Sequence, residues 1–318
     1  MTVSRSQQID LESTPYYHCM SRCVRRAYLC GEDRVRGESY EHRKGWIEWR
    51  MKYLSGIYGI QICAYAVMSN HYHMVLFVDK VRVLGWSEEE VLGRWRRMYP
   101  GDGKKIDLIS KAGGDITERI SVIRERLSSI SWFMRGMNEW IARESNREDG
   151  CEGRFWEKRF KSQALLDEGA ILSAMAYVDL NPIRAGEAQT PELSDYTSIQ
   201  ERIEGLNDSQ PEGLMPFQEE GREGAQISFK LSDYLTLVDQ TGRSIRGDKK
   251  GYIASDLEPL LERLQLQPKG WLQLIQSFEK EFAYVVGSQA SIRSFSQKQA
   301  RRAPKGFTFS KTMYQKVS

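Results

Sequence analysis

The feature of the sequence that most constrains the fold is a pair of apolar runs, residues 60–68 and 71–78, separated by the turn-prone pair Ser69 and Asn70. Both runs are rich in branched and aromatic residues, which favour strands, so together they predict a β-hairpin. His71 and His73 are two residues apart in the second run, and side chains on a strand alternate between its two faces. We therefore expect both imidazoles on one face.

The histidine pair has two interpretations. Two imidazoles on one face of a strand can hold one cation, and a purely structural strand does not need them in register. The chain has only four histidines, which makes the pairing notable. Two polar residues on one face are nevertheless a common arrangement in ordinary strands. The pattern alone leaves both the metal site and the structural alternative open.

Length and composition predict a soluble globular protein. A chain of 318 residues suggests one large or two ordinary domains, and 40% apolar content is enough for a packed core. No apolar run approaches the roughly 20 residues that span a bilayer, and the first residues lack the apolar stretch of a signal peptide. We therefore expect a cytoplasmic protein that does not engage membranes.

The five cysteines fit a reducing compartment, because their number is odd and no CxxC spacing occurs. Cys19, Cys23 and Cys30 could help to bind zinc, although their spacing is irregular. The formal charge of +3 results from 46 basic and 43 acidic groups. That value is too small to indicate nucleic-acid binding, so the distribution of charge matters more.

Local patterns predict the following order along the chain: a flexible leader (1–15), a first domain (16–205) with an insertion (79–115), a linker (206–226), and a helical C-terminal module with a basic tail (227–318). A strand is expected at 16–24. Apolar spacings of three and four predict helices at 40–58, 116–144 and 167–181, and a short one at 86–99. Further helical stretches occur at 229–238, 257–266 and 271–282. The first domain is therefore an α+β layer.

A basic and aromatic stretch, residues 153–166, is the best nucleic-acid candidate by composition. Basic side chains neutralise phosphates, and aromatic rings stack on unpaired bases. The structural alternative is a strand with one solvated basic edge and one buried aromatic edge, and composition does not decide between them. In this stretch the alternating residues are Arg154, Phe155, Trp156, Lys158, Arg159, Phe160 and Lys161. The tail at 293–305 is a second basic segment, of the kind that is usually just solvated.

The segment AYVDLNPIRAG, residues 176–186, is predicted to close a helix, because Pro182 disfavours helical geometry at the residue before it. Tyr177 lies in the last turns. Asn181 follows it by four residues, so both project from one face while the helix persists. A tyrosine here is by default a half-buried packing residue.

Several motifs together resemble one family. HYH at 71–73 after AYAVMSN, GRFWEKRFKSQALL at 153–166, AYVDLNPIRAG at 176–186 and the leading YYHCMSR resemble the HUH single-tyrosine transposases, most closely the REP-associated tyrosine transposase branch. The similarity covers residues 16–202. It implies a ferredoxin-like antiparallel sheet with helices on one face. About the insertion and the C-terminal module the resemblance says little.

The resemblance also implies a site. His71 and His73 are then metal ligands, Tyr177 is the nucleophile, and Asn181, where many relatives have Gln, is the nearby polar ligand. The metal is Mg²⁺ or Mn²⁺, and the substrate is single-stranded or hairpin DNA of the REP type, bound by a monomer or homodimer. The expected DNA-binding residues are the basic side chains in and near these motifs: Arg22, Arg25, Arg26, Arg154, Lys158, Arg159, Lys161 and Arg184.

The chemistry expected of this site is DNA nicking and strand transfer. The phenol would attack phosphorus and leave a 5′-phosphotyrosine and a free 3′ hydroxyl. A cation on the histidines would stabilise the charge that develops on the phosphate oxygens. Two alternatives remain: a DNA-hairpin-binding protein of transposase descent with little or no cleavage, and an RNA-binding regulator that uses residues 154–161.

Overall fold

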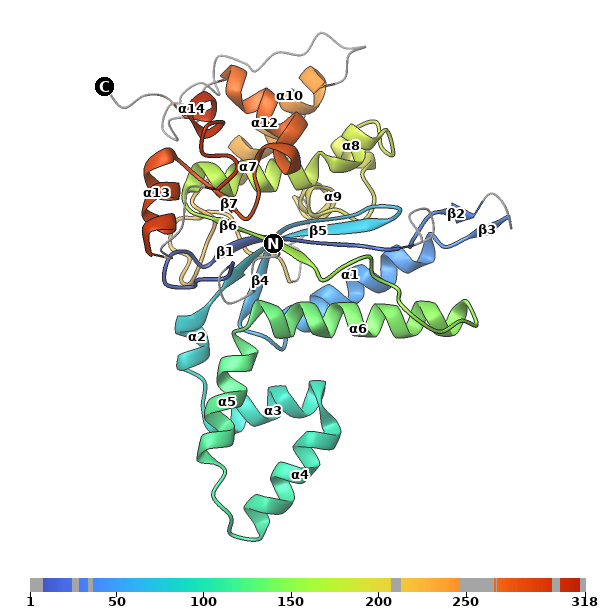
Figure 1. Cartoon of the computed structure of the whole chain (residues 1–318), viewed down its shortest axis with the longest axis vertical. Helices are drawn as coiled ribbons and strands as arrows, with labels where there is room; N and C mark the ends of the chain where they lie inside the picture. Colours follow the sequence, from blue (N-terminus) through green and yellow to red (C-terminus); the bar gives the residue numbers. More distant parts are fainter. Residues whose placement is uncertain are drawn as a thin grey trace.

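The protein is organised around one five-stranded sheet, with a two-stranded ribbon at one end (Figure 1). The computed structural model describes residues 8–24, 29–33, 37–206, 213–245, 266, 268–298 and 304–314. The strands in these ranges are β1 (Tyr16–Arg22), β2 (Glu32–Asp33), β3 (Glu38–Ser39), β4 (Ile60–Val67), β5 (His71–Val78), β6 (Lys161–Leu165) and β7 (Val285–Val286).

The main sheet has the strand order β4-β5-β1-β6-β7. The first four strands pair antiparallel, whereas β6 and β7 are parallel. The α+β prediction is confirmed, but the expectation of a wholly antiparallel sheet is wrong at the β7 edge. That edge strand comes from the C-terminal part of the chain, whose contribution to the sheet no local pattern in the sequence indicates.

The predicted hairpin is present as β4 and β5. Ile60 pairs with Val78 and Val67 with Tyr72, and the turn is closed by the amide of Met68, which donates to the His71 carbonyl at 2.8 Å. The apolar strand residues are buried on both faces of the sheet, as the continuous apolar runs require. The hairpin is therefore a central part of the core.

The helices in the described part of the chain vary from one turn to five turns. None of them is long and apolar enough to cross a membrane. They are α1 (His42–Ser55), α2 (Lys80–Leu84), α3 (Glu88–Met98), α4 (Pro100–Lys111), α5 (Thr117–Leu127), α6 (Ile130–Glu148), α7 (Glu168–Asp179), α8 (Asn181–Ala185), α9 (Ser198–Glu204), α10 (Leu231–Ile245), α12 (Pro268–Glu281), α13 (Gln289–Lys298) and α14 (Ser310–Met313).

Helices cover both faces of the sheet (Figure 1). Tyr72 and His73 are consecutive in β5 and so point to opposite faces. The Tyr72 hydroxyl donates to Asn138 of α6, whereas the His73 ring meets Tyr177 of α7. α1 packs beside α6 and α12 packs on α7. The expectation of helices on one face is therefore wrong, because α7 and α12 cover the face that carries the histidines.

The insertion at 79–115 is more helical than the sequence predicts. α3 confirms the short helix expected at 86–99, but α4 was not expected because it contains Gly101 and Gly103. Gly103 allows α4 to approach α3 closely, since a Cβ there would lie 2.6 Å from Arg96 Cγ. Together with α5 these helices form an arm that extends away from the sheet (Figure 1).

The long helix predicted at 116–144 is two helices, α5 and α6, which are separated at Ser128 and Ser129. Ser129 has extended backbone angles, with φ −100° and ψ 118°, so the chain changes direction there. The apolar stripe continues through both helices, which explains why the periodicity did not reveal the break. By contrast, the helix predicted at 167–181 ends two residues early, and Asn181 already belongs to α8.

The C-terminal part packs against the same sheet. β7 runs beside β6, with Val285 opposite Ala164, and the Met215 amide donates to the Ile62 carbonyl at 2.8 Å. Met215 and Phe217 of the predicted linker are therefore buried in the core, whereas residues 218–224 are exposed. α10 and α12 confirm two of the predicted helices. Of the helix predicted at 257–266 only Leu266 lies within the described residues, where it forms an isolated bridge with Tyr314. The domain boundaries stay a prediction.

Three of the cysteines of the first domain lie close together in the sequence and in the core. Cys19, Cys23 and Cys30 are buried and form no disulfide, and burial raises the pKa of Cys30 above its usual range. A buried neutral thiol is a poor zinc ligand, because the thiolate is the form that binds metal. Among the described residues no group of three or more His, Cys, Asp or Glu side chains is arranged to hold a metal ion.

Gly59 is the position where α1 returns to the sheet, and its lack of a side chain is required by packing. A Cβ at Gly59 would lie 1.9 Å from Val83 Cγ2 and 3.3 Å from the Asp79 carbonyl oxygen. We expect Gly59→Ala to reduce the free energy of unfolding by about 1–3 kcal/mol, as overpacking does. The measurement is urea unfolding followed by circular dichroism.

The matched control for this substitution is Gly93→Ala in α3, where a Cβ would meet nothing within 4 Å. Since alanine is the better helix former, this variant should be as stable as the wild type or more stable by up to about 1 kcal/mol. Equal losses of stability in both variants would show that the close contact at Gly59 is not the cause.

Candidate active site

The two histidines of β5 lie side by side on the face of the sheet that α7 covers. Their ring centroids are 4.8 Å apart. His73 is completely buried and pairs with Met20 of β1, while His71 is half-buried and pairs with Arg22. The sequence therefore placed both imidazoles correctly on one face of a strand.

A third histidine, His18, joins this pair and was not predicted. His18 lies on β1, and its Nε2 is 2.9 Å from His73 Nδ1, with the two rings stacked at a centroid distance of 5.1 Å. The alternation of YYHCMSR could have indicated it, because His18, Met20 and Arg22 share one face of a strand. What the sequence did not give was the pairing of β1 with β5.

Burial keeps these imidazoles neutral. It lowers the pKa of His71 to about 4, with a smaller lowering from the Arg22 charge. Burial, followed by the His71 and His18 rings, lowers the pKa of His73 well below its ordinary value. Burial also lowers the pKa of His18. A neutral imidazole has a free lone pair on one nitrogen, which is the form that binds a metal.

Tyr177 is positioned by α7, which begins where the Asp167 side chain accepts a hydrogen bond from the Ala170 amide. The helix is almost entirely apolar and packs across β4, β5 and β6. The Tyr177 ring lies 5.6 Å from that of His73 and 6.0 Å from that of His18, both nearly perpendicular to it. The structure thus brings Tyr177 and the predicted histidines together.

The phenol of Tyr177 is covered. It is 5% exposed, and the Phe278 ring of α12 stacks on it at 4.9 Å. Burial, and then the Glu279 carboxylate, raise the pKa of Tyr177 to about 12, whereas Arg184 acts in the lowering direction. The Arg184 guanidinium lies over the ring at 4.7 Å. The hydroxyl is therefore protonated at neutral pH.

Glu279 is a second residue that the sequence analysis missed. Its Oε1 lies 3.6 Å from His73 Nε2, too far for a hydrogen bond, and a neutral His73 makes no ion pair with it. Two ligands about 2.1 Å from one ion can be this far apart. In the sequence Glu279 is an ordinary polar position of an amphipathic helix, so no local signal marks it.

Asn181 is buried near the start of α8, and its Nδ2 has no hydrogen-bond partner among the described residues. This nitrogen therefore makes no hydrogen bond to His71, His73 or Tyr177. The helix ends between Tyr177 and Asn181, so the four-residue spacing does not guarantee a shared face. Its assignment as a metal ligand stays a prediction.

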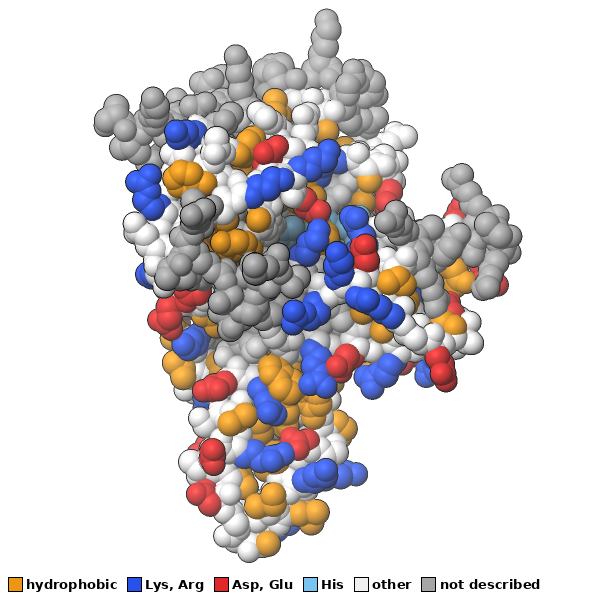
Figure 2. All heavy atoms as spheres, viewed as in Figure 1, with side chains coloured by type: hydrophobic (Ala, Val, Ile, Leu, Met, Phe, Trp, Pro, Cys, Tyr) orange, Lys and Arg blue, Asp and Glu red, His pale blue; other side chains and the backbone are white. Residues whose placement is uncertain are grey.

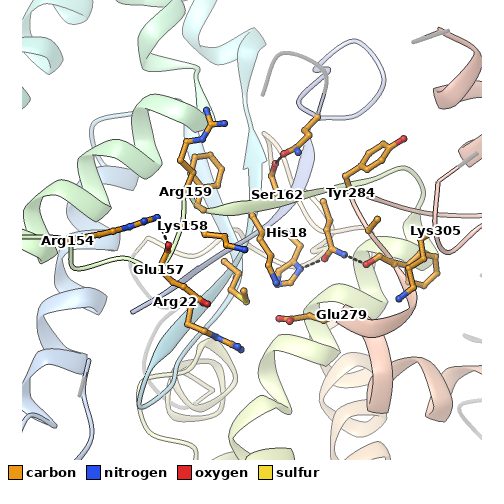
Figure 3. A pocket seen from close by; sticks show the side chains of 17 residues that line it. His18, Arg22, Arg154, Glu157, Lys158, Arg159, Ser162, Glu279, Tyr284 and Lys305 are labelled. Carbon is orange, nitrogen blue, oxygen red and sulfur yellow. Dashed lines mark hydrogen bonds between the residues drawn. The ribbon is translucent and has the colours of Figure 1, made fainter. Parts of the chain in front are cut away.

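A cavity of about 830 Å³ opens beside the histidines (Figure 3). Its wall includes His18 and Glu279, and Lys and Arg side chains gather around it on the molecular surface (Figure 2). Neither Tyr177 nor His73 lines it, so the phenol lies beneath the wall. Five predicted DNA-binding residues do line the cavity: Arg22, Arg154, Lys158, Arg159 and Lys161.

Some residues of the basic and aromatic stretch (153–166) pack inside the protein, and others line the cavity. Phe155 is buried, and the Trp156 indole donates to the Asn138 carbonyl, so both rings pack as the structural alternative requires. Phe160 and Lys158 instead line the cavity. Lys158 points toward His18, whereas Arg159 points away from it (Figure 3).

The remaining predicted DNA-binding residues are placed differently. Arg184 lies over Tyr177 and donates to the Gln276 carbonyl at 2.9 Å. Arg25 and Arg26 lie outside the described residues. Besides Glu279, the C-terminal part supplies four further wall residues, Phe282, Ala283, Tyr284 and Lys305, of which Lys305 belongs to the predicted basic tail.

The donor atoms present fit one divalent cation. The Asn70 side-chain oxygen lies against His71 Nδ1 and can only accept, which leaves the lone pair of His71 on Nε2. His73 Nε2 is buried with no hydrogen-bond partner among the described residues. By ligand type, these two imidazole nitrogens suit Mn²⁺ at least as well as Mg²⁺.

The comparisons with known proteins found one relevant similarity. No known family model and no curated protein matches the sequence. A solved structure of a REP-associated tyrosine transposase bound to a REP hairpin is similar, with a TM-score of 0.39 and 12% sequence identity. The alignment covers 73% of this chain and 99% of that one.

His71 gives a direct test of the neutral histidine pair. Because its pKa in the folded protein is about 4, below the ordinary 6.5, the proton binds the unfolded chain more tightly. We expect an NMR titration of metal-free protein to give a midpoint near pH 4. The contribution of His71 to the free energy of unfolding should fall as the pH decreases from about 6.5 to 4. A midpoint near 6.5 would show a solvated imidazole.

Proposed function

We propose that the chain is a metal-dependent DNA nickase and strand transferase of the HUH single-tyrosine type, acting on single-stranded or hairpin DNA of the REP type. One observation carries the proposal. The Tyr177 ring on α7 lies 5.6 Å from the His73 ring on β5, beside a cavity walled by basic residues. The nucleophile, the ligand pair and the phosphate-binding groups assigned from the sequence thus converge from distant segments.

The order of the elements supports the same proposal. β1, α1, β4, β5, α6 and β6 follow one another along the chain, and their strands lie in the order β4-β5-β1-β6. This is the β-α-β-β-α-β arrangement of ferredoxin-like sheets. α1 and α6 lie on one face, and the tyrosine helix α7 lies on the other.

Each of these residues has its own role in the proposed reaction. Lys158 and Lys161 hold the DNA backbone at the cavity, and Arg22, which lines the same cavity, is the strand partner of His71. The Tyr177 oxygen attacks phosphorus, which forms the 5′-phosphotyrosine bond and releases the 3′ oxygen. Glu279, whose charge acts on the phenol of Tyr177, is placed to accept its proton. Attack by another 3′ hydroxyl reverses the step and joins strands.

A cation on His71 and His73, Mn²⁺ or Mg²⁺, would supply charge stabilisation at the phosphate oxygens. The two imidazoles are suited to this task because they are neutral and fixed. The protein contributes rigidity, because His73 is completely buried and its Nδ1 is held by His18 Nε2 at 2.9 Å.

The covalent intermediate gives the decisive experiment. Labelled hairpin DNA with a single-stranded flank is incubated with the protein and Mn²⁺, and the products are separated under denaturing conditions. We expect a protein–DNA adduct that is absent in Tyr177→Phe, because only the hydroxyl is removed and the buried ring remains.

The matched control is Tyr284→Phe, since Tyr284 is a phenol in the cavity wall. Its adduct should equal that of the wild type. If the adduct is lost in Tyr284→Phe and retained in Tyr177→Phe, the assignment of Tyr177 as the nucleophile is wrong. Hairpin binding without an adduct at any Mn²⁺ concentration would reject the nickase.

A second candidate function is binding of hairpin DNA without cleavage. The specific observation in its favour is that Phe278 stacks on Tyr177 and leaves it 5% exposed. Little of the phenol is therefore accessible to a phosphate. The adduct experiment separates the two candidates, and the same assay with hairpin RNA tests the regulator that would use residues 154–161.

The cavity residues determine how affinity depends on salt. Lys158→Ala should remove about one phosphate contact, so the slope of log affinity against log salt concentration decreases by about 1 for hairpin DNA. The measurement is fluorescence anisotropy at several NaCl concentrations. Lys104→Ala, an exposed change on α4 far from the cavity wall, should leave the slope unchanged. Equal slopes in all three proteins would exclude Lys158 from the interface.

A further inference from the structure

A chain of buried hydrogen bonds connects His73 to the backbone of the C-terminal part. His73 Nδ1 meets His18 Nε2 at 2.9 Å, and His18 Nδ1 meets the Gln163 side-chain oxygen at 2.7 Å. Gln163 Nε2 then donates to the Phe282 carbonyl at 3.1 Å (Figure 3). The three side chains are each less than a tenth exposed, so water does not compete for these bonds.

The donor and acceptor in each of these hydrogen bonds follow from the last acceptor of the series, the Phe282 carbonyl. The Phe282 carbonyl can only accept, so the amide NH₂ of Gln163 must face it and the amide oxygen must face His18. That oxygen also only accepts, so His18 carries its proton on Nδ1. His18 Nε2 is then a lone pair, which accepts the proton of His73 Nδ1.

The opposite direction is disfavoured. It would place the Gln163 oxygen 3.1 Å from the Phe282 oxygen, with a hydrogen bond lost and two acceptors in contact in the core. Glu279 acts the other way, since a carboxylate in front of His73 Nε2 attracts a proton to that nitrogen. The Glu279 side chain is 27% exposed and its Oε1 lies 3.6 Å from His73 Nε2, so water weakens this attraction. The hydrogen bonds from His73 through His18 to Gln163 are buried, so water does not weaken them.

We infer that His18 and Gln163 are positioning residues that keep the proton of His73 on Nδ1 and leave Nε2 bare toward the cation site. The purpose of this arrangement rests on the proposed metal-dependent function. His73 Nε2 is a buried nitrogen without a hydrogen-bond partner among the described residues. A proton there would be an unsatisfied buried donor, whereas a lone pair there is what a cation requires.

The inference also gives the C-terminal part a role in the site. The carbonyl that orients Gln163 belongs to Phe282, just after α12, while Gln163 itself lies on β6. β7 holds this region in place by pairing with β6. The state of the histidine on β5 is thus determined by a segment more than 200 residues later in the chain, which neither the hairpin nor α7 could supply.

The test reads the protonated nitrogen directly. The protein is labelled with ¹⁵N-histidine, which gives only four imidazoles to assign, and two-dimensional NMR of the metal-free protein identifies the protonated nitrogen of each ring. We expect His18 and His73 both to carry the proton on Nδ1. A His73 ring protonated on Nε2 would overturn the inference without any variant.

Three variants extend the test. Gln163→Leu and His18→Leu should let a proton appear on His73 Nε2 and weaken Mn²⁺ binding, measured by EPR, by about 10- to 100-fold. His18→Gln keeps an oxygen that can accept from His73 Nδ1, so it should recover part of the affinity. Asn138→Leu is the control, because it removes a side-chain amide on the opposite face of the sheet and should leave both readouts unchanged.

The outcomes separate this inference from the proposed function. If the leucine variants fold, retain the His73 tautomer and bind Mn²⁺ like the wild type, the positioning role is wrong even if the DNA adduct forms. If the tautomer and the Mn²⁺ affinity change as expected but no adduct forms with any DNA, the positioning role stands and the nickase is wrong.

Discussion

The pairing of β1 with β5 is the constraint on which the rest of the site depends. It places Met20 opposite His73 and Arg22 opposite His71, which brings His18 into contact with His73. A shift of one residue would turn every side chain of β1 to the other face. His18 would then face α6, and the hydrogen-bond chain from Phe282 could not reach the histidine pair. Because both faces are buried, such a shift would also place Arg22 in the core.

Local periodicity was enough to predict the parts of the fold that a short segment determines by itself. The hairpin, α1 and α7 follow from apolar spacings within the segment, and the shared face of His71 and His73 follows from strand alternation. The break at Ser128 and Ser129 and the formation of α4 did not follow, because they depend on packing between segments. At Gly103, for example, the contact with Arg96 outweighs the low helix propensity of glycine.

The missed site residues have the same explanation. His18, Gln163 and Glu279 are unremarkable in their own segments, and each acquires its role from a partner far away in the sequence. Gln163 on β6 meets His18 145 residues earlier and the Phe282 carbonyl 119 residues later. No spacing rule covers such pairs. The described C-terminal residues were expected to form a separate helical module, yet they supply one strand, one wall of the cavity and the cover over Tyr177.

Burial has opposite consequences for the two kinds of side chain at this site. It disfavours charge on every group. For the role proposed for His71 and His73 this is useful, because the neutral imidazole is the form that binds a metal. For the role proposed for Tyr177 it is a cost, because a phenolate is the stronger nucleophile and burial raises the pKa of Tyr177 to about 12. The two charged neighbours of the phenol act in opposite directions, Glu279 raising its pKa and Arg184 lowering it. Arg184 is held to α12 by the Gln276 carbonyl, and Glu279 lies on the same helix beside Phe278. The ionisation of Tyr177 is therefore influenced from α12, which supplies the ring that covers the phenol, the carboxylate that raises its pKa and the carbonyl that holds Arg184.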